Sequence, residues 1–397
     1  MLRTFTRHYS QVFKPGDVAL ARHVLQPDKI YLSKPLTPGK VFDVGKYKIA
    51  HDEILGQTVR TTITPSTAKP SKGPQQKYIL TYPTMEEFLL NRRRDAQPIY
   101  PLDASAIVSL ADIHVDEATE GVQQFLEAGT GHGSLTLAIS RVLHAANGEA
   151  RAAKRKQPAP AASEQNPEES EAASTESKGP ELRKAILHSI DRNHSFSRTG
   201  RHNVRDFRHG MYRDNVEFHV CESPEAWLTN DETSGAWKAL ANTSNFLHGA
   251  FLDLPSPDTS IDAIARHLAV NAPLVVFCPS VSQIQNMVEH VRVCPDLDLT
   301  LVNTVELMPG MGGGSLRAWD IRSTVARSTG EVVRVCRPRV GTMVSGGGFV
   351  SVFRKLQPGA MAELAKLKEQ EAREKEAKRA EQMAQKDAED ATEEAKA

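Results

Sequence analysis

The sequence lacks several features that would place it in particular classes of protein. Its 397 residues contain no apolar run near the roughly 20 residues that a membrane-spanning helix needs. Four widely spaced cysteines, without a C-x-x-C pair, argue against a disulfide framework and give no metal site. The formal net charge is zero, so overall charge does not indicate a nucleic-acid partner. We expect a multidomain protein of a reducing compartment, with neither a membrane span nor a bound metal.

Large apolar residues are scarce in two stretches of the chain. Residues 149–183 are rich in Ala, Pro, Ser, Glu and Lys, and residues 358–397 are nearly all Ala and charged or amide residues. Neither stretch can bury enough apolar surface to offset the entropy of ordering it. We therefore predict a disordered insert at 149–183 and a charged tail at 358–397 that is partly helical or disordered.

The N-terminal part divides into two segments. Residues 1–12 contain Arg3 and Arg7 and no acid, a composition typical of a short mitochondrial targeting segment, with a nuclear or cytosolic protein as the alternative. Residues 13–82 consist of short β-branched or alternating runs separated by turn residues, such as 41–44 and 77–82. This spacing predicts a small β-domain.

Strand and helix patterns alternate from residue 83 to residue 357. Gly341 to Phe353 adds a glycine-rich and then β-branched stretch that suits a final antiparallel hairpin. The alternation predicts a doubly wound, Rossmann-like α/β domain with the insert inside it. The expected strands are 123–127, 185–190, 216–220, 245–252 and 273–277, and the expected helices include 134–143 and 282–293.

A glycine-rich turn lies between the first of these strands and the next helix. Gly129, Gly131 and Gly133 follow Glu127, and glycine lets the backbone adopt positive φ and approach a ligand closely. A dinucleotide site has the spacing G-x-G-x-x-G, with a helix N-terminus at the pyrophosphate. The spacing G-x-G-x-G after an acid suits a ligand with an amino-acid end and a sulfonium. We interpret it as a site for S-adenosylmethionine; a tight turn without a ligand is the alternative.

Asp191 ends the second predicted strand and is a candidate for binding the cofactor's ribose. It lies 62 residues after Gly129, far more than the usual separation of about 20. Without the 35 residues of the insert the separation is 27, which restores a plausible spacing. A surface loop acid is the alternative interpretation.

Asp253 ends another apolar strand and precedes Leu254-Pro255-Ser256-Pro257, whose prolines stiffen the turn. Methyl transfer to a ring nitrogen such as adenine N1 needs no strong base, but the product carries a positive charge. A carboxylate that accepts a hydrogen bond from the neighbouring amine would orient the base and stabilise that charge. We interpret Asp253 as the catalytic residue; a simple turn cap is the alternative.

Arginine clusters are the remaining feature of note. A solvated surface would explain any one of them, whereas several in one enzyme favour a polyanionic substrate. The clusters are Arg92-Arg93-Arg94; Arg198, Arg201, Arg205, Arg208 and Arg213; and Arg334, Arg337 and Arg339.

Five ordered segments give the chain a family resemblance, which covers residues 13–355 apart from the insert. It resembles the catalytic subunit of the tRNA (adenine-58-N1)-methyltransferase family, in an organellar form. The segments are Phe13-Lys14-Pro15-Gly16-Asp17 with His51-Asp52-Glu53-Ile54-Leu55-Gly56; Gln97-Pro98-Ile99-Tyr100-Pro101-Leu102-Asp103; Glu127-Ala128-Gly129-Thr130-Gly131-His132-Gly133-Ser134; Phe251-Leu252-Asp253-Leu254-Pro255-Ser256-Pro257; and Phe277-Cys278-Pro279-Ser280-Val281-Ser282-Gln283-Ile284.

The resemblance implies a class I methyltransferase fold, a β-domain that contacts tRNA, and a tetramer. That tetramer is either a homotetramer or a pairing with a related non-catalytic subunit. Asp253 would lie at the target adenine, position 58 of the T-loop, and Asp191 at the cofactor ribose. Asp253 would also contact the cofactor, and the other implied cofactor-binding residues are Ile99, Glu127, Gly129, Thr130, Gly131, Gly133, Ser134 and Val220.

Three segments depart from the family pattern. His219-Val220-Cys221 stands where an Asp near the cofactor adenine is usual, Gly346-Gly347-Gly348-Phe349 replaces His-Thr-Gly before an aromatic, and Asp258-Thr259-Ser260 lacks the usual Trp. Two other functions stay open: a protein carboxyl methyltransferase of the same fold, and a non-catalytic tRNA-binding subunit.

Overall fold

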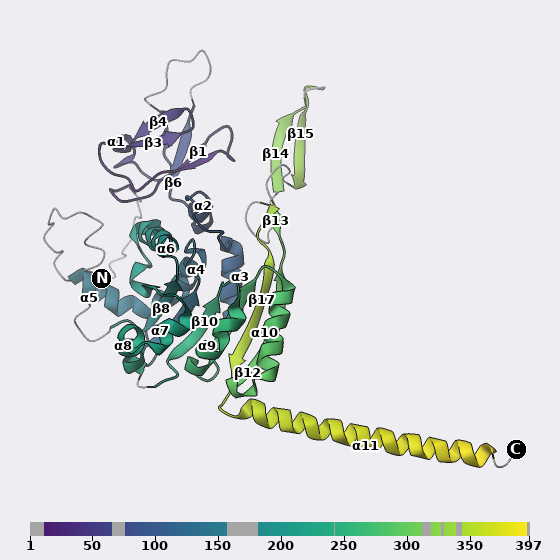
Figure 1. Ribbon diagram of the computed structural model, residues 1–397. Helices are drawn as coiled ribbons and strands as arrows, with labels where there is room; N and C mark the ends of the chain where they lie inside the picture. Colours follow the sequence, from purple (N-terminus) through teal and green to yellow (C-terminus); the bar gives the residue numbers. More distant parts are fainter. Residues whose placement is uncertain are drawn as a thin grey trace, which may run out of the picture.

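The computed structural model describes residues 12–65, 76–156, 182–241, 243–311, 319–326, 329–338 and 344–394. A small β-domain lies against one end of a larger α/β domain (Figure 1). A two-stranded hairpin stands beside the β-domain, and a long C-terminal helix leaves the opposite end of the molecule (Figure 1). The expected targeting segment lies almost wholly outside the described residues.

The β-domain has its own buried core. One sheet has the strand order β2-β1-β6-β5, and β3 and β4 form a separate hairpin followed by helix α1. Phe13, Leu36, Ile49 and Leu80 from these segments are each no more than 1% exposed. The strand-rich pattern of the N-terminal sequence therefore does fold as β-structure. The elements are β1 (Leu20–His23), β2 (Ile30–Leu32), β3 (Val41–Val44), β4 (Tyr47–Ala50), α1 (His51–Ile54), β5 (Thr62–Ile63) and β6 (Tyr78–Thr81).

The α/β domain is built on a seven-stranded sheet with the order β12-β17-β11-β10-β7-β8-β9. β17 is antiparallel to both of its neighbours, and the pairings among β11, β10, β7, β8 and β9 are parallel. The predicted doubly wound α/β fold is confirmed. The strands are β7 (Gln123–Ala128), β8 (Ala185–Asp191), β9 (Val216–Val220), β10 (Leu247–Leu252), β11 (Pro273–Cys278), β12 (Leu299–Leu307) and β17 (Gly348–Lys355).

Helices cover both faces of the sheet because successive strand residues point to opposite sides. Phe125 packs in a cluster with α3, α4 and α6, whereas Leu126 packs in a second cluster with α7, α9 and α10. Helix α2 begins with a capping box between Thr84 and Glu87. The helices are α2 (Met85–Leu90), α3 (Pro101–Ala111), α4 (Ser134–Leu143), α6 (His194–Asp206), α7 (Pro224–Thr229), α8 (Asp231–Ala241), α9 (Ile261–His267) and α10 (Val281–Val293).

Short 3-10 turns and two small pairings complete the domain. β13 pairs with β16, and β14 pairs with β15 in the projecting hairpin. These elements are η1 (Ala145–Asn147), η2 (Phe207–His209), η3 (Arg213–Asn215), η4 (Pro257–Ser260), η5 (Pro295–Leu297), β13 (Gly310–Met311), β14 (Trp319–Val325), β15 (Val332–Pro338) and β16 (Val344–Ser345).

The structure corrects two expectations about the chain's irregular parts, and of the two alternatives for the tail it has the helical one. Residues 148–156, expected to be disordered from 149 onward, form helix α5 (Gly148–Lys156), while residues 157–181 lie outside the described part. The tail forms one 35-residue helix, α11 (Ala360–Glu394). The expected final hairpin is wrong in its pairing, because the main antiparallel partners of β17 are β11 and β12, which come earlier in the chain.

Within the described residues, no helix is both long enough and apolar enough to cross a bilayer. In the same part of the chain, no three His, Cys, Asp or Glu side chains are grouped so that they could hold a metal ion.

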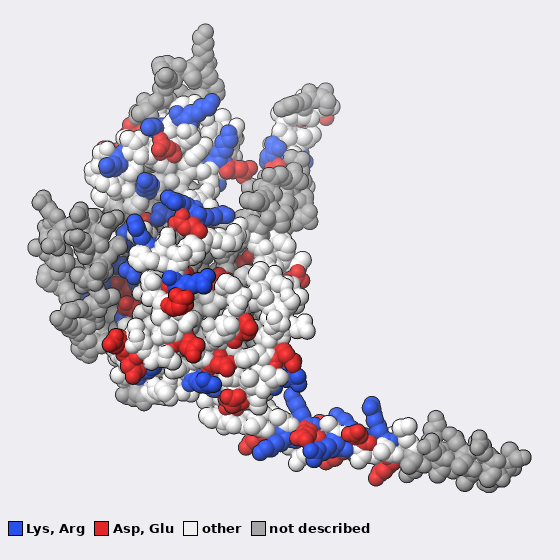
Figure 2. Space-filling view, in the orientation of Figure 1, with Lys and Arg blue, Asp and Glu red and all other residues white. Residues whose placement is uncertain are grey.

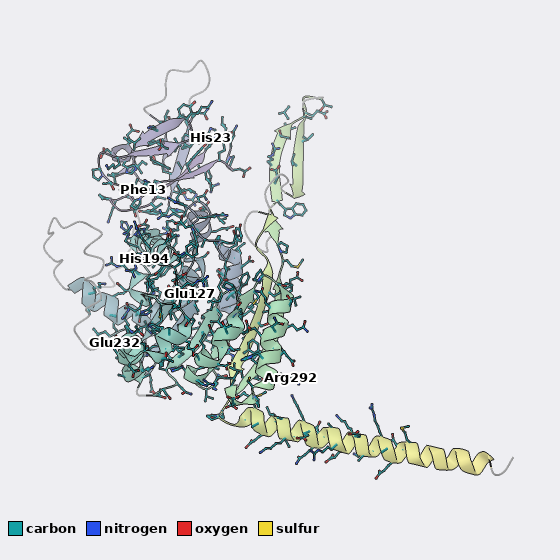
Figure 3. All side chains as sticks on the ribbon, in the orientation of Figure 1. Phe13, His23, Glu127, His194, Glu232 and Arg292 are labelled. Carbon is teal, nitrogen blue, oxygen red and sulfur yellow. The ribbon has the colours of Figure 1, made fainter. Side chains whose placement is uncertain are left out.

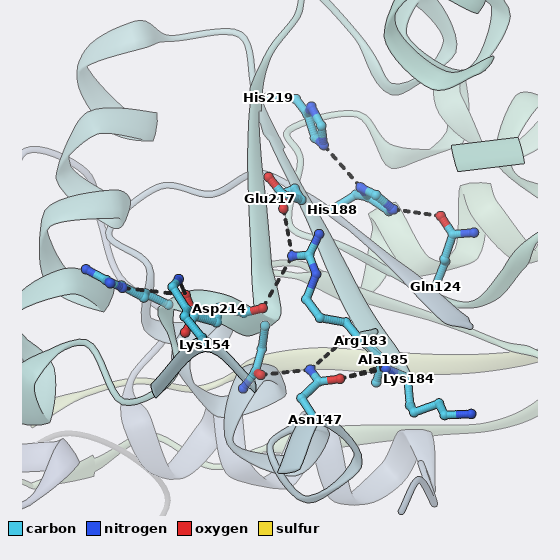
Figure 4. Close-up of polar contacts among 12 residues, drawn as sticks. Gln124, Asn147, Lys154, Arg183, Lys184, Ala185, His188, Asp214, Glu217 and His219 are labelled. Carbon is cyan, nitrogen blue, oxygen red and sulfur yellow. Dashed lines mark hydrogen bonds and ion pairs between the residues drawn. The ribbon is translucent and has the colours of Figure 1, made fainter. Parts of the chain in front are cut away.

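Asn147 joins the two ends of the insert. Its fully buried amide donates to Ala185 O at 2.7 Å and to Asn215 Oδ1 at 2.9 Å, and its oxygen accepts from the Lys184 N–H at 2.8 Å (Figure 4). This one side chain therefore fixes the start of β8 against the end of the α4 segment.

We predict that Asn147→Ala lowers the free energy of unfolding by about 3 kcal/mol, because several buried polar groups lose their partner at once. Urea denaturation of the whole chain measures it. Asn91→Ala is the matched control: Asn91 is exposed and its side chain donates to Glu87 O. It should cost less than about 1 kcal/mol. Equal losses for the two variants would contradict the bridging role of Asn147.

Candidate active site

The glycine turn connects β7 to α4, and its three glycines have a backbone conformation that other residues rarely adopt. Gly129, Gly131 and Gly133 have φ values of +98°, +48° and +80°. A Cβ on Gly129 would lie 2.2 Å from the Asp253 carbonyl oxygen, and one on Gly133 would lie 2.8 Å from Gly200 Cα. Two contacts across the domain therefore require glycine: one with the end of β10 and one with α6.

Asp191 ends β8, the strand beside β7, and its carboxylate lies against the glycine turn. It accepts hydrogen bonds from the Gly131 N–H at 2.9 Å and from the Asn193 N–H at 2.8 Å. The sheet thus brings Asp191 next to the turn although the insert separates them in sequence. A carboxylate has about four acceptor positions, so two hydrogen bonds leave capacity for a ligand.

Asp253 follows β10, on the other side of β7. Its backbone N–H donates to Ala128 O at 2.9 Å, which extends the strand pairing to the edge of the sheet. Burial raises the pKa of the Asp253 carboxyl to about 7, and the nearby Asp191 carboxylate adds to the effect. Asp191 and Asp253 are therefore held at the same edge of the sheet, and without a cation nearby Asp253 resists ionisation.

Glu127 lies in the centre of the α/β domain and is completely buried (Figure 3). Its Oε2 accepts from the Thr136 and Ser189 hydroxyls, each at 2.7 Å. Its Oε1 has no hydrogen-bond partner among the described residues. Burial raises the pKa of Glu127 to about 8, against the lowering effect of the two hydroxyls. The acid before the glycine turn therefore favours its neutral form.

A cavity of about 710 Å³ opens at this edge of the sheet. Five residues selected from the sequence line it together: Ile99, Gly129, Gly131, Asp191 and Asp253. The remaining five are placed elsewhere. Thr130 and Gly133 belong to the turn, and Glu127 and Ser134 flank it, but none of the four lines the cavity. Val220 is 49% exposed, and its neighbour Cys221 lines the cavity instead.

Several lining residues were not selected from the sequence. Tyr100, Phe196 and Phe277 add aromatic surface to the cavity. Gly347 also lines it, and its N–H donates to the buried Asp103 carboxylate at 3.3 Å across 244 residues of sequence. Tyr100 and Phe277 lie inside two of the five resemblance segments, so the sequence did contain an indication that they belong to the site. Phe196 lies outside these segments, and nothing in the sequence indicated it.

The cavity has the size and the chemistry that S-adenosylmethionine requires. Its volume lies within the roughly 300–1,000 Å³ range of small-molecule sites. Apolar side chains such as Ile99 and Phe196 suit a purine, and two carboxylates suit ribose hydroxyls and a cationic centre. The Gly129 conformation lets the backbone approach a ligand without a Cβ in the way.

His219, which stands where the family usually has an acid, takes part in a buried polar chain. His188 and His219 share a hydrogen bond of 3.1 Å between Nδ1 and Nε2, and His188 Nε2 bonds Gln124 Oε1 at 3.0 Å (Figure 4). The His219 ring also packs on Trp227, with centroids 4.9 Å apart. Burial lowers its pKa to about 4, so it is neutral at pH 7. His219 therefore takes part in packing at the end of β9 and does not line the cavity.

The buried Glu127 makes a stability prediction for the protein without cofactor. Its pKa of about 8 exceeds the ordinary value of 4.5, so between these pH values the folded state holds a proton that the unfolded state releases. The free energy of unfolding should therefore fall as pH rises from 5 to 8, by at most about 1.4 kcal/mol per pH unit for this group. Urea denaturation at pH 5, 6.5 and 8 measures the slope, and Glu127→Gln should reduce it. An unchanged slope in the variant would show that Glu127 is already ionised in the fold.

Comparison with known proteins adds relatives of sequence and of fold. No family model matches the chain. Two tRNA (adenine(58)-N(1))-methyltransferases named TrmI, from two strains of Thermus thermophilus, are each 27% identical to it over 293 residues. Each of these alignments covers 72% of this chain and 82% of the relative.

Solved structures show the same fold at lower identity. An S-adenosylmethionine-dependent O-methyltransferase from Thermotoga maritima aligns with a TM-score of 0.54 and 14% identity, over 87% of this chain and 95% of that one. A tRNA (m1A58) methyltransferase TrmI from Aquifex aeolicus aligns with a TM-score of 0.50 and 18% identity, over 87% and 99%. The Rossmann-like methyltransferase fold is confirmed, and so is the resemblance read from the five segments: this chain is similar to the tRNA (adenine-58-N1)-methyltransferases along most of its length.

Proposed function

We propose that this protein transfers a methyl group from S-adenosylmethionine to N1 of an adenine in tRNA, position 58 of the T-loop. One observation carries the proposal: the glycine turn, Asp191 and Asp253 line a single cavity at the carboxyl edge of the sheet. Ligands bind at this edge in open α/β sheets. The similarity to the Thermus enzymes supports the choice of adenine and of tRNA.

The two acids have separate tasks in this scheme. When bound, S-adenosylmethionine supplies a methyl group on a positively charged sulfonium. Asp191 binds the ribose hydroxyls with the acceptor positions that Gly131 and Asn193 leave open. Asp253 accepts a hydrogen bond from the exocyclic amine of the adenine, which directs N1 at the methyl carbon and stabilises the charge that develops on the base.

The protonation state of Asp253 sets the pH dependence of this mechanism. Only the carboxylate can accept the amine hydrogen bond with a full negative charge, and in the free protein its pKa is about 7. A cationic ligand nearby favours the charged form and lowers that pKa. The ionised form of Asp253 is therefore the one that interacts favourably with both the sulfonium and the adenine amine. Burial disfavours that form in the protein without ligand.

We predict that Asp253→Ala and Asp253→Asn each reduce methyl transfer to a tRNA transcript at least about 100-fold, because the variants cannot stabilise the developing charge. Binding of S-adenosylmethionine, measured by calorimetry, should change much less. For the unmodified protein, kcat/KM should rise with pH through about 7, and the residual rate of Asp253→Asn should not.

Asp258→Asn is the control for these variants, since Asp258 lies on the same loop but does not line the cavity. Equal loss of cofactor binding and of transfer in the Asp253 variants would exclude the assigned role. Absence of transfer by the unmodified protein, with cofactor binding intact, would favour a non-catalytic tRNA-binding subunit.

We also propose that copies of this chain associate as a tetramer through the β14–β15 hairpin. Two-stranded hairpins are marginally stable alone in water. This one projects from the α/β domain and exposes Trp319, Ile321 and Val332 at 50%, 75% and 72% (Figure 1). A second copy that covers these side chains would remove apolar surface from water and protect the strand edges.

Ile321→Glu should lower the molar mass in solution by disrupting this association, because it places a charge in the covered surface. Analytical ultracentrifugation measures the mass. Glu331→Gln, on the same hairpin but polar already, is the control. If the unmodified chain alone is a monomer and becomes larger only with a related subunit, the hetero-tetramer is correct and the homotetramer is not.

A further inference from the structure

Helix α6 and the turns that follow it carry a concentrated positive charge that the chemistry of the cavity does not use. Residues 192–213 contain six arginines and one acid, Asp206. Arg198, Arg201, Arg205 and Arg208 are spaced three, four and three residues apart, and three of the four lie on α6 itself. The three on α6 have the spacing of residues that share one side of a helix, and Arg208 follows the end of the helix at Phe207. We call these four residues the arginine face of α6.

The arginine face is largely open to solvent. Arg198, Arg205 and Arg208 are exposed, and Arg201 is half-buried against the Phe218 ring. Asp206 is buried and shared, with Arg92 at 2.7 Å and Arg205 at 3.1 Å. Figure 2 shows Lys and Arg side chains grouped where the β-domain meets the α/β domain. Arginines therefore outnumber acids by five over residues 192–213, although the formal charge of the whole chain is zero.

The position of α6 connects the cavity to the β-domain. Arg192, Asn193 and Phe196, at and just before its first turn, line the cavity. Beyond its last turn, His209 Nε2 lies 2.5 Å from Asp17 Oδ1 of the β-domain, and Arg208 donates to Pro83 O at 3.3 Å. A ligand bound along the arginine face would thus reach the cavity at one end and the β-domain at the other.

The backbone at this junction is held in an unusual conformation. Arg208 and His209 are consecutive residues with φ values of +51° and +56°, a region that non-glycine residues rarely occupy. The contact of His209 with Asp17, together with the Arg208 guanidinium 5.0 Å above the Tyr82 ring, holds them there. Surrounding contacts must fix such residues, so α6 has a defined orientation relative to the β-domain.

We propose that the arginine face of α6 binds the phosphodiester backbone of the RNA substrate between the β-domain and the cavity. This inference rests on the proposed function. Guanidinium groups bind phosphates in a bidentate manner, and a row of them on a rigid helix positions a strand without reading its sequence. An acidic protein partner is less well matched. Protein interfaces have an apolar centre, and over residues 192–213, all within the described part, Met211 is the one exposed large hydrophobic side chain.

The double variant Arg198→Gln/Arg205→Gln tests the proposal in the full chain. Fluorescence anisotropy with a labelled tRNA transcript should show affinity reduced roughly tenfold or more, because two phosphate contacts are lost. The slope of log affinity against log salt should decrease in magnitude by about 1.4 to 1.8. Neither residue lines the cavity, so calorimetric binding of S-adenosylmethionine should not change.

Arg292→Gln/Arg373→Gln is the matched control. Both arginines are exposed and ion-paired, Arg292 lies on α10 and Arg373 on α11, and Figure 3 shows Arg292 far from His194 at the start of α6. Its tRNA affinity and salt slope should equal those of the unmodified protein. If the α6 variant is unstable on heating, Arg198→Gln alone should still lower the slope by about 0.7 to 0.9.

The outcomes separate this proposal from the proposed function. If the unmodified protein binds S-adenosylmethionine but neither binds nor methylates tRNA, the proposed function fails. If it methylates tRNA and the α6 variant matches the control in affinity and slope, the arginine face is not the RNA surface. Loss of poly-L-glutamate binding with unchanged tRNA binding would overturn the proposal in favour of an acidic protein partner.

Discussion

The close approach of Gly129 to the Asp253 carbonyl is the constraint on which the site depends. A Cβ at Gly129 would lie 2.2 Å from that oxygen, so the turn after β7 and the end of β10 can meet only through glycine. The hydrogen bond from the Asp253 N–H to Ala128 O, at 2.9 Å, holds the two together. On the other side of β7, Asp191 is held by the Gly131 N–H. One turn thereby places two carboxylates from different strands in one cavity, which no local sequence segment could do.

Asp253 and the buried Glu127 behind the turn destabilise the free protein when they are ionised. Burial raises the pKa of Asp253 to about 7 and that of Glu127 to about 8, and each neighbouring carboxylate raises them further. A ligand with a positive centre relieves this repulsion, since it favours the charged form of any acid nearby. The site is therefore better matched to a cation than to a phosphate. The same electrostatics separates this turn from a dinucleotide site, where a pyrophosphate would add to the negative charge.

Sequence reasoning found the parts of the site that are local in the chain and missed those that depend on packing. The glycine turn and Asp253 each stand at a strand end with a recognisable pattern, and both line the cavity. Cys221 lines it in place of Val220, because a shift of one residue at the end of β9 decides which side chain faces inward. Phe196 stands on a polar helix, with nothing in its sequence context to indicate an inward position. The pairing of β17 with β12 joins segments about 50 residues apart, a distance over which periodicity carries no information.

The insert lengthens the sequence between the glycine turn and Asp191 beyond the usual separation, yet the two still meet in the structure. In a parallel sheet, ligands bind at the carboxyl ends of the strands, whereas the connection from α4 back to β8 enters at the amino end. Asn147 binds Ala185 and Lys184 there and closes that connection. β8 then runs seven residues to Asp191, about 20 Å at the rise of an extended strand. Lengthening a closed loop costs free energy only logarithmically. The chain can therefore carry additional residues at the amino end of β8 while Asp191 and the Gly131 N–H keep their hydrogen bond at the other.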